Sequence, residues 1–406
     1  MQPAIIQPAV RNDDFLVVPP PVDANSLVLS ATTDIASLAQ QWRGLELRAV
    51  GHVFQTWAWV SNWHTHIGTA RKIEPFIVAA HSRDGTMRAL LPFGIHSRAG
   101  MRTLVWLGDE HADYKGPLID RDLLPGLTAG AMQRMFDSAV KLAPRIDAVR
   151  LLDMPEQFGS TAHPLLVYPN QPAPVASHAL TLKPDFDRLY KEHRGTSSRK
   201  KLRQKQRRLE EAEGPVSLKI ATTPSARSRA ISALIDQKRA RLNQMGVADM
   251  FATPQVRAFY RTLAEQHPDI CQLSTLDAGD TPVAANWGLV WGDRYYYVLS
   301  TMTSGEHQHL STGQLHLNEL ISWSADRGLK VFDFTAGDET YKDDWCDTAM
   351  GLFDVHYGLT IKGRLLAWFN AHTRTAKRKI KHHEPLWNTA QKLRKKVHDL
   401  RMKTGW

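Results

Sequence analysis

The sequence predicts an α+β protein that folds as two domains. Its 406 residues exceed the roughly 100 to 200 residues of an ordinary single domain. With 43% hydrophobic and 23% charged residues, the composition is typical of a soluble globular protein and excludes a disordered or collagen-like chain. In each half, β-rich runs precede a helical segment and one further strand. This order is typical of helices packed on a mainly antiparallel sheet.

The first half, residues 28–175, is expected to form one mixed domain. An aromatic and apolar stripe at helical spacing predicts a helix within residues 54–68. Three β-rich runs separated by turn residues follow within residues 74–108, as in an antiparallel meander. A helix over residues 127–143 and a strand over residues 148–154 complete the half.

The domain boundary is predicted near residue 175. Residues 155–175 are rich in Pro, Gly, Ser and Asn and lack a clear periodicity, as in a linker. The second domain, residues 176–370, follows the same order of elements without a repeat at the level of residues. Its last helix is expected at residues 311–328, and a strand follows directly at residues 331–335.

Charge divides the chain into an acidic body and two basic segments. The net charge of the whole chain is +10. Residues 188–208 hold ten basic residues and one acidic residue, and residues 372–406 hold eleven basic and two acidic residues. The two segments together carry +18, so the rest of the chain carries −8. The basic composition is therefore no argument for nucleic acid binding.

The sequence indicates a cytoplasmic protein. No stretch approaches the roughly 20 uninterrupted apolar residues of a membrane helix, which excludes an integral membrane protein. Residues 1–27 lack the design of a secretory signal and are expected to form a flexible tail. Two cysteines, Cys271 and Cys346, are too few for a disulfide scaffold. A peripheral position at the inner membrane face is expected only if a basic segment binds lipid.

The start of the helix at residues 311–328 is the first candidate site. A strand ends near Met302, a polar loop follows, and Ser311 or Thr312 can cap a helix that begins at Gly313 or Gln314. Unpaired N–H groups at a helix start can hold phosphate, and Gly313 allows a ligand to approach the backbone. An ordinary capped helix is the alternative, since no glycine-rich nucleotide motif accompanies this start.

The segment VFDFTAGDETYKDDW, residues 331–345, is the second candidate site. Its polar groups follow the end of a strand, where side chains can face a cleft. A carboxylate such as Asp333 could remove a proton from an amine or hydroxyl, Tyr341 could protonate a leaving thiolate, and Lys342 could neutralise an oxyanion. A solvated charged turn is the alternative.

These two segments resemble the C-terminal half of the CelD/BcsL-like acetyltransferases, a branch of the GNAT superfamily. The matching runs are STGQLHLNELISWSADRG and F-D-F-x-x-G-x-x-x-Y-K-x-x-W. The runs FQTWAWVSNW and LGDEHADYKGPLID are similar to other recurrent segments of that family, so the resemblance spans roughly residues 30–370.

The resemblance implies tandem GNAT-like domains and an acetyl-CoA or another acyl-CoA donor. By the match, Gly313 and Gln314 fall where the phosphates of CoA would lie, next to Ser311 and Thr312. Asp333, Gly337, Tyr341 and Lys342 fall on the family's signature run. The loop departs from the full Q/R-x-x-G-x-G/A pattern of ordinary GNAT enzymes.

The basic segment at residues 188–208 is expected to be a surface helix at a ligand cleft. Read as a helix, it has only Leu202 and Leu209 as an apolar stripe, which excludes a core position. Its cations repel one another unless an anion lies nearby, although a solvated charged face is the alternative. The residues expected at the edge of the donor or substrate cleft are Arg199, Lys200, Arg203 and Asp338.

The last segment, residues 371–406, predicts a basic amphipathic helix. It could dock on an anionic membrane surface or on the protein's own acidic body, and nucleic acid is not an expected partner. Its predicted apolar stripe consists of Leu386, Trp387, Ala390, Leu393, Val397 and Leu400.

The sequence therefore predicts an acyl-CoA-dependent acyltransferase. We expect acetyl transfer to an amine or hydroxyl of a small molecule or saccharide, and the family suggests exopolysaccharide or cellulose biosynthesis as the context. No metal is expected, because His307, His309 and His316 near the donor loop lack a carboxylate partner. The alternatives are a FemABX-like aminoacyl transferase that uses aminoacyl-tRNA, and a non-catalytic GNAT-fold binding protein.

Overall fold

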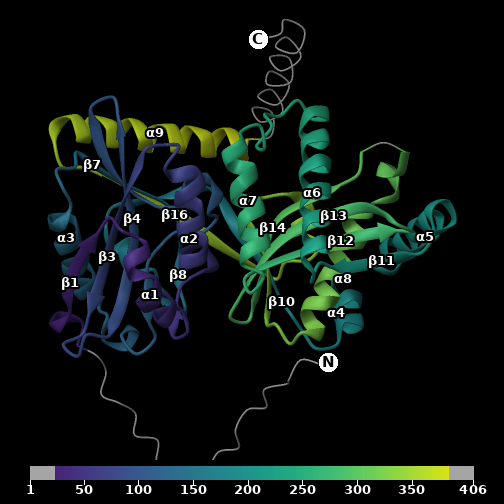
Figure 1. The fold of residues 1–406 in the computed structure, drawn as a ribbon, viewed down its shortest axis with the longest axis horizontal. Helices are drawn as coiled ribbons and strands as arrows, with labels where there is room; N and C mark the ends of the chain where they lie inside the picture. Colours follow the sequence, from purple (N-terminus) through teal and green to yellow (C-terminus); the bar gives the residue numbers. More distant parts are fainter. Residues whose placement is uncertain (1–22, 305, 384–406) are drawn as a thin grey trace, which may run out of the picture.

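One mixed sheet runs through both halves of the protein. The structure is a computed structural model that describes residues 23–304 and 306–383. In these residues the large sheet has 14 strands, most of them antiparallel, with helices packed against it (Figure 1). The predicted α+β class is confirmed.

Strands and helices follow a similar order in the two halves. The strands are β1 Val28–Thr32, β2 Ala49–Val50, β3 Ile73–His81, β4 Met87–Arg98, β5 Met101–Trp106, β6 Leu118–Asp120, β7 Ala148–Pro155, β8 Gln157–Phe158, β9 Thr161–Ala162, β10 Asn170–Thr181, β11 Val216–Ile220, β12 Cys271–Ala278, β13 Thr281–Trp291, β14 Arg294–Met302, β15 Val331–Ala336 and β16 Thr348–Gly358. The helices are α1 Ala39–Glu46, α2 Trp57–Trp63, α3 Ala129–Leu142, α4 Phe186–His193, α5 Thr196–Glu213, α6 Pro224–Gln244, α7 Pro254–Gln266, α8 Thr312–Asp326 and α9 Ile361–His382. Along the sheet the main strands lie in the order β1, β3, β4, β5, β7, β16, β10, β15, β14, β13, β12, β11.

Each half contains one parallel strand pair bridged by a helix, as the sequence predicted. Strands β5 and β7 flank α3, and strands β14 and β15 flank α8. Each pair is registered over only three residues, 103–105 with 148–150 and 294–296 with 331–333. Because β14 and β15 both continue after their last registered pair, the two strands separate beyond Tyr296 and Asp333.

Strand β16 ties the two halves together. It lies in the C-terminal half of the sequence, yet it pairs with β7 of the N-terminal half on one side and with β10 on the other. Strand β10 passes through residue 175 and also pairs with β15. The sheet is therefore continuous at the predicted boundary, and the division into two domains there stays a prediction.

Aromatic packing between α2 and α7 also joins the halves. The rings of Trp59 and Phe259 meet edge to face with centroids 5.4 Å apart. The Asn62 side-chain amide donates a hydrogen bond to the Phe259 carbonyl oxygen at 2.9 Å. Both contacts are buried, so polar groups from the two halves can be held at fixed positions beside this core.

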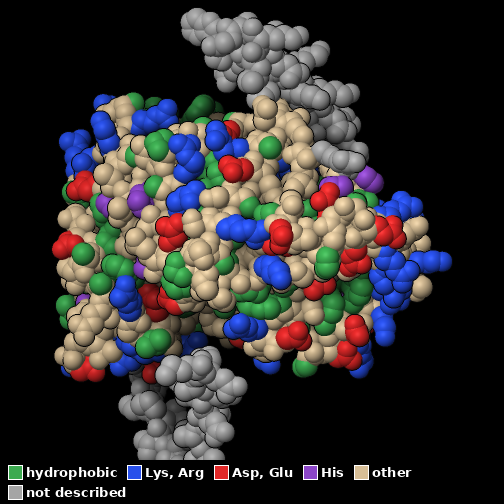
Figure 2. All heavy atoms as spheres, turned by 45° about the vertical axis from the view of Figure 1, so that its right-hand side comes forward, with side chains coloured by type: hydrophobic (Ala, Val, Ile, Leu, Met, Phe, Trp, Pro, Cys, Tyr) green, Lys and Arg blue, Asp and Glu red, His purple; other side chains and the backbone are tan. Residues whose placement is uncertain are grey.

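The two basic segments form helices of different kinds. In α5, Leu202 and Leu209 are the buried residues, and Lys and Arg side chains gather at the right-hand end of the molecule, where α5 lies (Figure 2). Helix α9 begins at Ile361, before the predicted start of the tail at residue 371, and lies across the top of the N-terminal half in Figure 1, against β16, β10 and β7. The predicted apolar stripe from Leu386 onward lies outside the described residues. Among the helices that the structure describes, none is both long enough and apolar enough to cross a bilayer.

Candidate acyl-donor and catalytic site

Helix α8 follows strand β14 and presents unpaired backbone N–H groups. Its N-cap, Ser311, has a left-handed φ of 57°, and the Ser311 carbonyl oxygen accepts from the N–H groups of Gln314 and Leu315 at 2.9 and 3.1 Å. No described residue accepts from the N–H groups of Thr312 or Gly313. These groups lie at the positive end of the helix dipole, so the site can bind an anion.

Buried hydroxyl groups lie beside this helix start. Thr312 is fully buried, and Thr301 near the end of β14 is 5% exposed. The side-chain oxygens of Thr301, Thr303 and Thr312 are buried and have no hydrogen-bond partner among the described residues. Buried polar atoms are usually paired, so the unpaired Thr312 hydroxyl in the first turn of α8 indicates a site for a polar ligand.

Two more residues shape the helix start. A Cβ atom built on Gly313 would lie 3.2 Å from Met302 Sδ, so the backbone there packs closely on the end of β14. Lys205 on α5 donates from Nζ to Ser311 Oγ at 2.7 Å. A cation beside unpaired N–H groups suits a phosphate ligand. Of the predicted donor residues, Ser311, Thr312, Gly313 and Gln314 lie together here.

The separation of β14 from β15 links this helix start to the second candidate site. Met302 lies six positions after Tyr296 in β14, which is about 20 Å of extended strand. The two predicted segments therefore lie near opposite ends of this stretch of β14. The start of α8 lies beside Met302, and Asp333 lies beside Tyr296.

Asp333 is buried in β15 and fully hydrogen-bonded. Its Oδ1 accepts from the Tyr114 hydroxyl at 2.6 Å and from the Thr335 N–H at 2.7 Å. Its Oδ2 accepts from Arg294 at 2.7 Å. Thr335 has a left-handed φ of 62°, which is strained for a β-branched residue. Because both oxygens of Asp333 are bonded, this carboxylate orients Tyr114 and Arg294 and is not a free base.

Asp113 is the carboxyl group at this site that is suited to accept a proton. Burial raises its pKa to about 6, although a hydrogen bond from Thr335 and the charges of Lys115 and Lys342 oppose the shift. A carboxylate with this pKa is ionised at neutral pH and is basic enough to take up a proton during a reaction. This candidate acid–base group comes from the N-terminal half.

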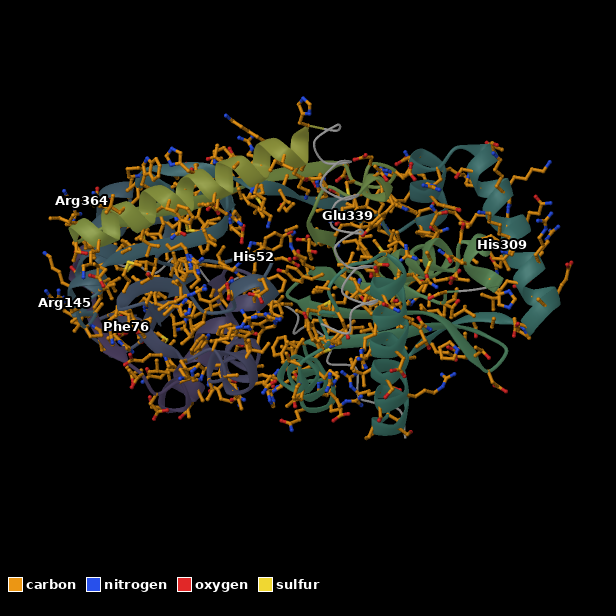
Figure 3. The ribbon with its side chains drawn as sticks, turned by 90° about the horizontal axis from the view of Figure 1, so that it is seen from above. His52, Phe76, Arg145, His309, Glu339 and Arg364 are labelled. Atoms are coloured by element: carbon orange, nitrogen blue, oxygen red, sulfur yellow. The ribbon has the colours of Figure 1, made fainter. Side chains whose placement is uncertain are left out.

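A histidine from the N-terminal half borders the same cluster. The His52 ring lies 4.5 Å from the Tyr114 ring, and its Nδ1 lies 3.3 Å from the Tyr296 hydroxyl. Burial lowers the pKa of His52, so the imidazole is neutral at pH 7. Seen from above, His52 lies at the inner edge of its half, whereas Glu339 lies in the other half and His309 near its far end (Figure 3).

A cavity of about 330 Å³ opens onto Asp333 where the two halves meet. Both polar and apolar groups face it, so it can receive a small hydroxylated or amine-bearing molecule. Its lining includes Tyr114, Glu156, Gln157, Ser177, Ala179, Thr181, Arg294, Val331, Asp333, Thr348, Ala349 and Met350.

Tyr341 and Lys342 lie in the turn after β15. Lys342 is buried and donates from Nζ to the carbonyl oxygens of Thr335 and Gly337 at 3.3 and 3.0 Å. The same Nζ lies 2.9 Å from a carboxylate oxygen of Glu339. Burial raises the pKa of Tyr341, which keeps the phenol protonated. Lys342 therefore holds the backbone of the strained turn.

Replacing Lys342 by Met is expected to lower the free energy of unfolding by about 1–3 kcal/mol, because two buried carbonyl oxygens lose their donor. Urea unfolding measures the change, with exposed Lys330→Met after α8 as the matched control. Unchanged stability together with lost transfer would instead favour a direct role of the ammonium in the chemistry.

The predicted cleft-edge residues lie in two places. Arg199 and Arg203 line a second cavity of about 330 Å³ between α4, α5 and the first turns of α8, while Lys200 is exposed. Asp338 lies elsewhere: its Oδ1 accepts from the Ala176 N–H at 3.2 Å, and its Oδ2 lies 3.3 Å from Lys381 Nζ. The structure thus brings Arg199 and Arg203 near α8 and separates Asp338 from them.

The histidines near the donor loop are engaged separately. His316 is buried, and its Nε2 lies within hydrogen-bonding distance of Ser274 Oγ, at 3.0 Å. The Nε2 of His307 lies 2.6 Å from a carboxylate oxygen of Glu213. Over the described residues, no three His, Cys, Asp or Glu side chains are grouped as metal ligands.

Sequence reasoning missed the residues that the N-terminal half contributes. Asp113, Tyr114 and Lys115 belong to the run LGDEHADYKGPLID, which carried the family resemblance without a chemical role. Lys205 was counted among ten basic residues and was not distinguished from them. Contacts between residues far apart in the sequence, such as Tyr114 with Asp333 and Lys205 with Ser311, show which of these side chains lie at the candidate sites.

Residues 196–343 match a family model described as an acetyltransferase (GNAT) domain. This range contains α8, β15 and Lys342. Among curated proteins there is no significant match.

Solved structures share the fold at low sequence identity. The structure of FemX is 10% identical, with 80% of this chain and 96% of that chain covered and a TM-score of 0.54. A conserved protein of unknown function from Bacteroides thetaiotaomicron is 10% identical, with 80% and 99% covered and a TM-score of 0.50. A tandem GNAT protein from the clavulanic acid biosynthesis pathway is 10% identical, with 82% and 98% covered and a TM-score of 0.40.

These findings confirm the predicted fold class and support the superfamily. The CelD/BcsL-like family within the superfamily stays a prediction. Residues 196–343 match a GNAT acetyltransferase domain model, within a chain whose two halves share one mixed sheet.

Proposed function

We propose that this protein transfers an acyl group from an acyl-CoA to an amine or hydroxyl of a small acceptor. One observation carries the proposal: the unpaired N–H groups of Thr312 and Gly313 lie in the same helix turn as the buried, unpartnered Thr312 hydroxyl, beside Lys205. From there β14 extends to Tyr296, which pairs with Asp333, and Asp113 lies near Asp333. Acetyl-CoA is the proposed donor because of the family resemblance.

Asp113 is the proposed general base. The acceptor's lone pair attacks the thioester carbonyl carbon, the carbon–sulfur bond breaks, and the acceptor's proton passes to the Asp113 carboxylate. The sulfur leaves as a thiolate and takes its proton from solvent, while the protonated Tyr341 phenol can donate a hydrogen bond to the departing sulfur. Asp333 holds Tyr114 and Arg294 in place, and Lys342 holds the turn that carries Tyr341. Most of the acceleration comes from orienting the two substrates.

The cavity beside Asp333 is the proposed acceptor site. The hydroxyl groups of Ser177, Thr181 and Thr348 and the carboxylate of Glu156 are among its lining residues. These groups can hydrogen-bond a hydroxylated acceptor, so a saccharide is the proposed substrate class. A role in exopolysaccharide or cellulose biosynthesis rests on the family resemblance alone.

Thermal unfolding with candidate donors tests the proposal. A ligand present at a hundredfold excess over its Kd stabilises the folded state by about 2.7 kcal/mol. We expect acetyl-CoA to raise the melting temperature and tRNA to leave it unchanged. A shift with tRNA alone would favour an aminoacyl transferase, for which the fold likeness to FemX is the supporting observation. No shift with either ligand would favour a non-catalytic binding protein.

A single charge tests the donor site. Gln314 is exposed in the first turn of α8, and Gln314→Glu places an anion where the phosphates are proposed to bind. An acidic side chain in the first turn stabilises the helix itself, so folding is preserved. We expect CoA binding to weaken at least about tenfold, which corresponds to about 1.4 kcal/mol.

Calorimetric titration with CoA measures this effect. Gln133→Glu, an exposed position on α3, makes the same change of charge away from the site and is expected to bind CoA like the wild type. Equal CoA affinity in the two variants would show that the phosphates of CoA do not bind at the start of α8.

A further inference from the structure

The exposed apolar side chains of this protein are concentrated on one helix. Eleven large hydrophobic residues are exposed among those that the structure describes; five of them lie within α9 and a sixth, Leu359, lies just before it. Four of the six form a continuous outer stripe at spacings of four, three and one residues. These four, called the α9 stripe below, are Ile361 (79% exposed), Leu365 (67%), Trp368 (61%) and Phe369 (59%).

Contacts on the opposite face fix the orientation of α9. Arg374 donates to a carboxylate oxygen of Asp354 at 2.6 Å and is also paired with Asp153. A Cβ atom on Gly363 would lie 1.7 Å from the Asp147 carbonyl oxygen, so the helix backbone lies directly on the protein there. The Ala371 carbonyl oxygen accepts from the Gln171 side chain at 3.1 Å. The α9 stripe therefore faces away from the body as a consequence of the fold.

Cations flank the α9 stripe without acidic residues between them. Residues 361–383 contain seven Lys and Arg and no Asp or Glu. Arg374 and Lys381 are paired on the inner side of the helix. The other five are exposed and form no ion pair with any described residue. They are Lys362, Arg364, Lys377, Arg378 and Lys379.

We propose that α9 docks this protein on the surface of an anionic lipid bilayer. An apolar stripe with aromatic residues, bordered by Lys and Arg, is the composition of a helix that lies in the plane of a membrane interface. Each exposed cation near an anionic surface contributes attraction that salt weakens. A second copy of this chain fits less well, because it would bring two sets of unpaired cations together. This inference does not depend on the proposed acyl transfer.

The site of docking differs from the one the sequence indicated. The predicted lipid-binding stripe began at Leu386, whereas the α9 stripe lies at residues 361–369 and was assigned to the body of the C-terminal domain. Its exposure could not be read from spacing, since an apolar face at these positions is also what a buried helix requires.

Vesicle flotation with the full chain tests the proposal. We expect the protein to float with vesicles of phosphatidylcholine containing about one third phosphatidylglycerol, and to remain unbound with phosphatidylcholine alone. The double variant Trp368→Ala, Phe369→Ala is expected to lower the bound fraction at least about tenfold, because two aromatic side chains no longer enter the interface. Trp368→Phe is expected to retain binding.

Matched variants exclude indirect causes. Leu47→Ala, Leu142→Ala removes two exposed apolar side chains elsewhere and is expected to float like the wild type. All variants are expected to keep the wild-type melting temperature, since the substituted side chains contact solvent. Equal binding to both vesicle types, or unchanged flotation of the Trp368, Phe369 variant, would overturn the proposal. Loss of a dimer in that variant, without any vesicle binding in the wild type, would identify a second copy as the occupant.

Discussion

Asp113→Asn is expected to lower kcat/KM for acyl transfer by about 10²–10⁴-fold, the usual contribution of a general base. The substitution keeps the size of the side chain and removes its ability to accept the acceptor's proton. Binding of CoA is expected to remain, because Asp113 lies near Asp333, beside the part of β14 that is distant from α8. Steady-state kinetics and CoA titration on the same preparations separate these two effects.

The pH profile gives an independent readout of Asp113. Its pKa of about 6 predicts that kcat/KM rises with pH up to about 6 and then levels off, since only the carboxylate accepts a proton. The Asn variant should lack this rise. The stability of the fold changes with pH in the opposite sense. In the folded chain the Asp113 carboxyl group stays protonated up to about pH 6, whereas its ordinary pKa is 3.8. Wild-type stability from this group is therefore present at low pH and is lost as pH rises through 6.

Two results would contradict this role for Asp113. If Asp113→Asn retained wild-type turnover, the base would have to be sought elsewhere. If Tyr114→Phe abolished activity while Asp113→Asn did not, the hydroxyl bonded to Asp333 would be the reacting group.

Arg374→Met is expected to lower the free energy of unfolding by about 3–5 kcal/mol, the cost of leaving buried carboxylates without their cation. Arg374 pairs with both Asp153 and Asp354, and the Asp354 side chain is fully buried. Burial alone would raise the pKa of Asp153, but Lys115 and Arg374 outweigh it and lower the pKa to about 2. Urea unfolding measures the loss, and Arg378→Met, at an exposed arginine of α9, serves as a control within about 0.5 kcal/mol of the wild type.

The loss should depend on pH in a defined direction. A carboxyl group with a lowered pKa stabilises the fold above its ordinary pKa, and this contribution is lost as pH falls toward 2. The difference between wild type and Arg374→Met should thus be greatest at neutral pH and shrink below about pH 4. Adding Asp354→Asn to Arg374→Met should recover part of the stability, since one unpaired charge is removed. A loss that is the same at every pH would mean that packing, rather than charge, is responsible.

Local patterns in the sequence predicted the local parts of this structure. The helical spacing, the capping residues and the strand before them placed α8 and the β14–α8–β15 unit, because these features depend on neighbouring residues. The start of α8 as a candidate phosphate site followed from the same local signals.

Features that depend on distant pairing could not be predicted. Asp113 and Asp333 lie far apart in the chain, and both border the same site only because the Tyr114 hydroxyl meets Asp333. Lys342 follows a strand end, which suggested chemistry, yet its bonds to Thr335 and Gly337 show a backbone role that no spacing reveals. Which group pairs with a charged side chain depends on the fold, so it could not be predicted from the spacing of residues along the sequence.

The position of β16 has a consequence for how the protein is made. This strand is synthesised long after β7 and β10, yet it fills the place between them. Until residues 348–358 leave the ribosome, both of these strands present open edges that can pair with other chains. A chaperone that shields strand edges should therefore raise the yield of folded protein most when translation is slowed late in the chain. Residues 348–358 thus make completion of the sheet a late and vulnerable step.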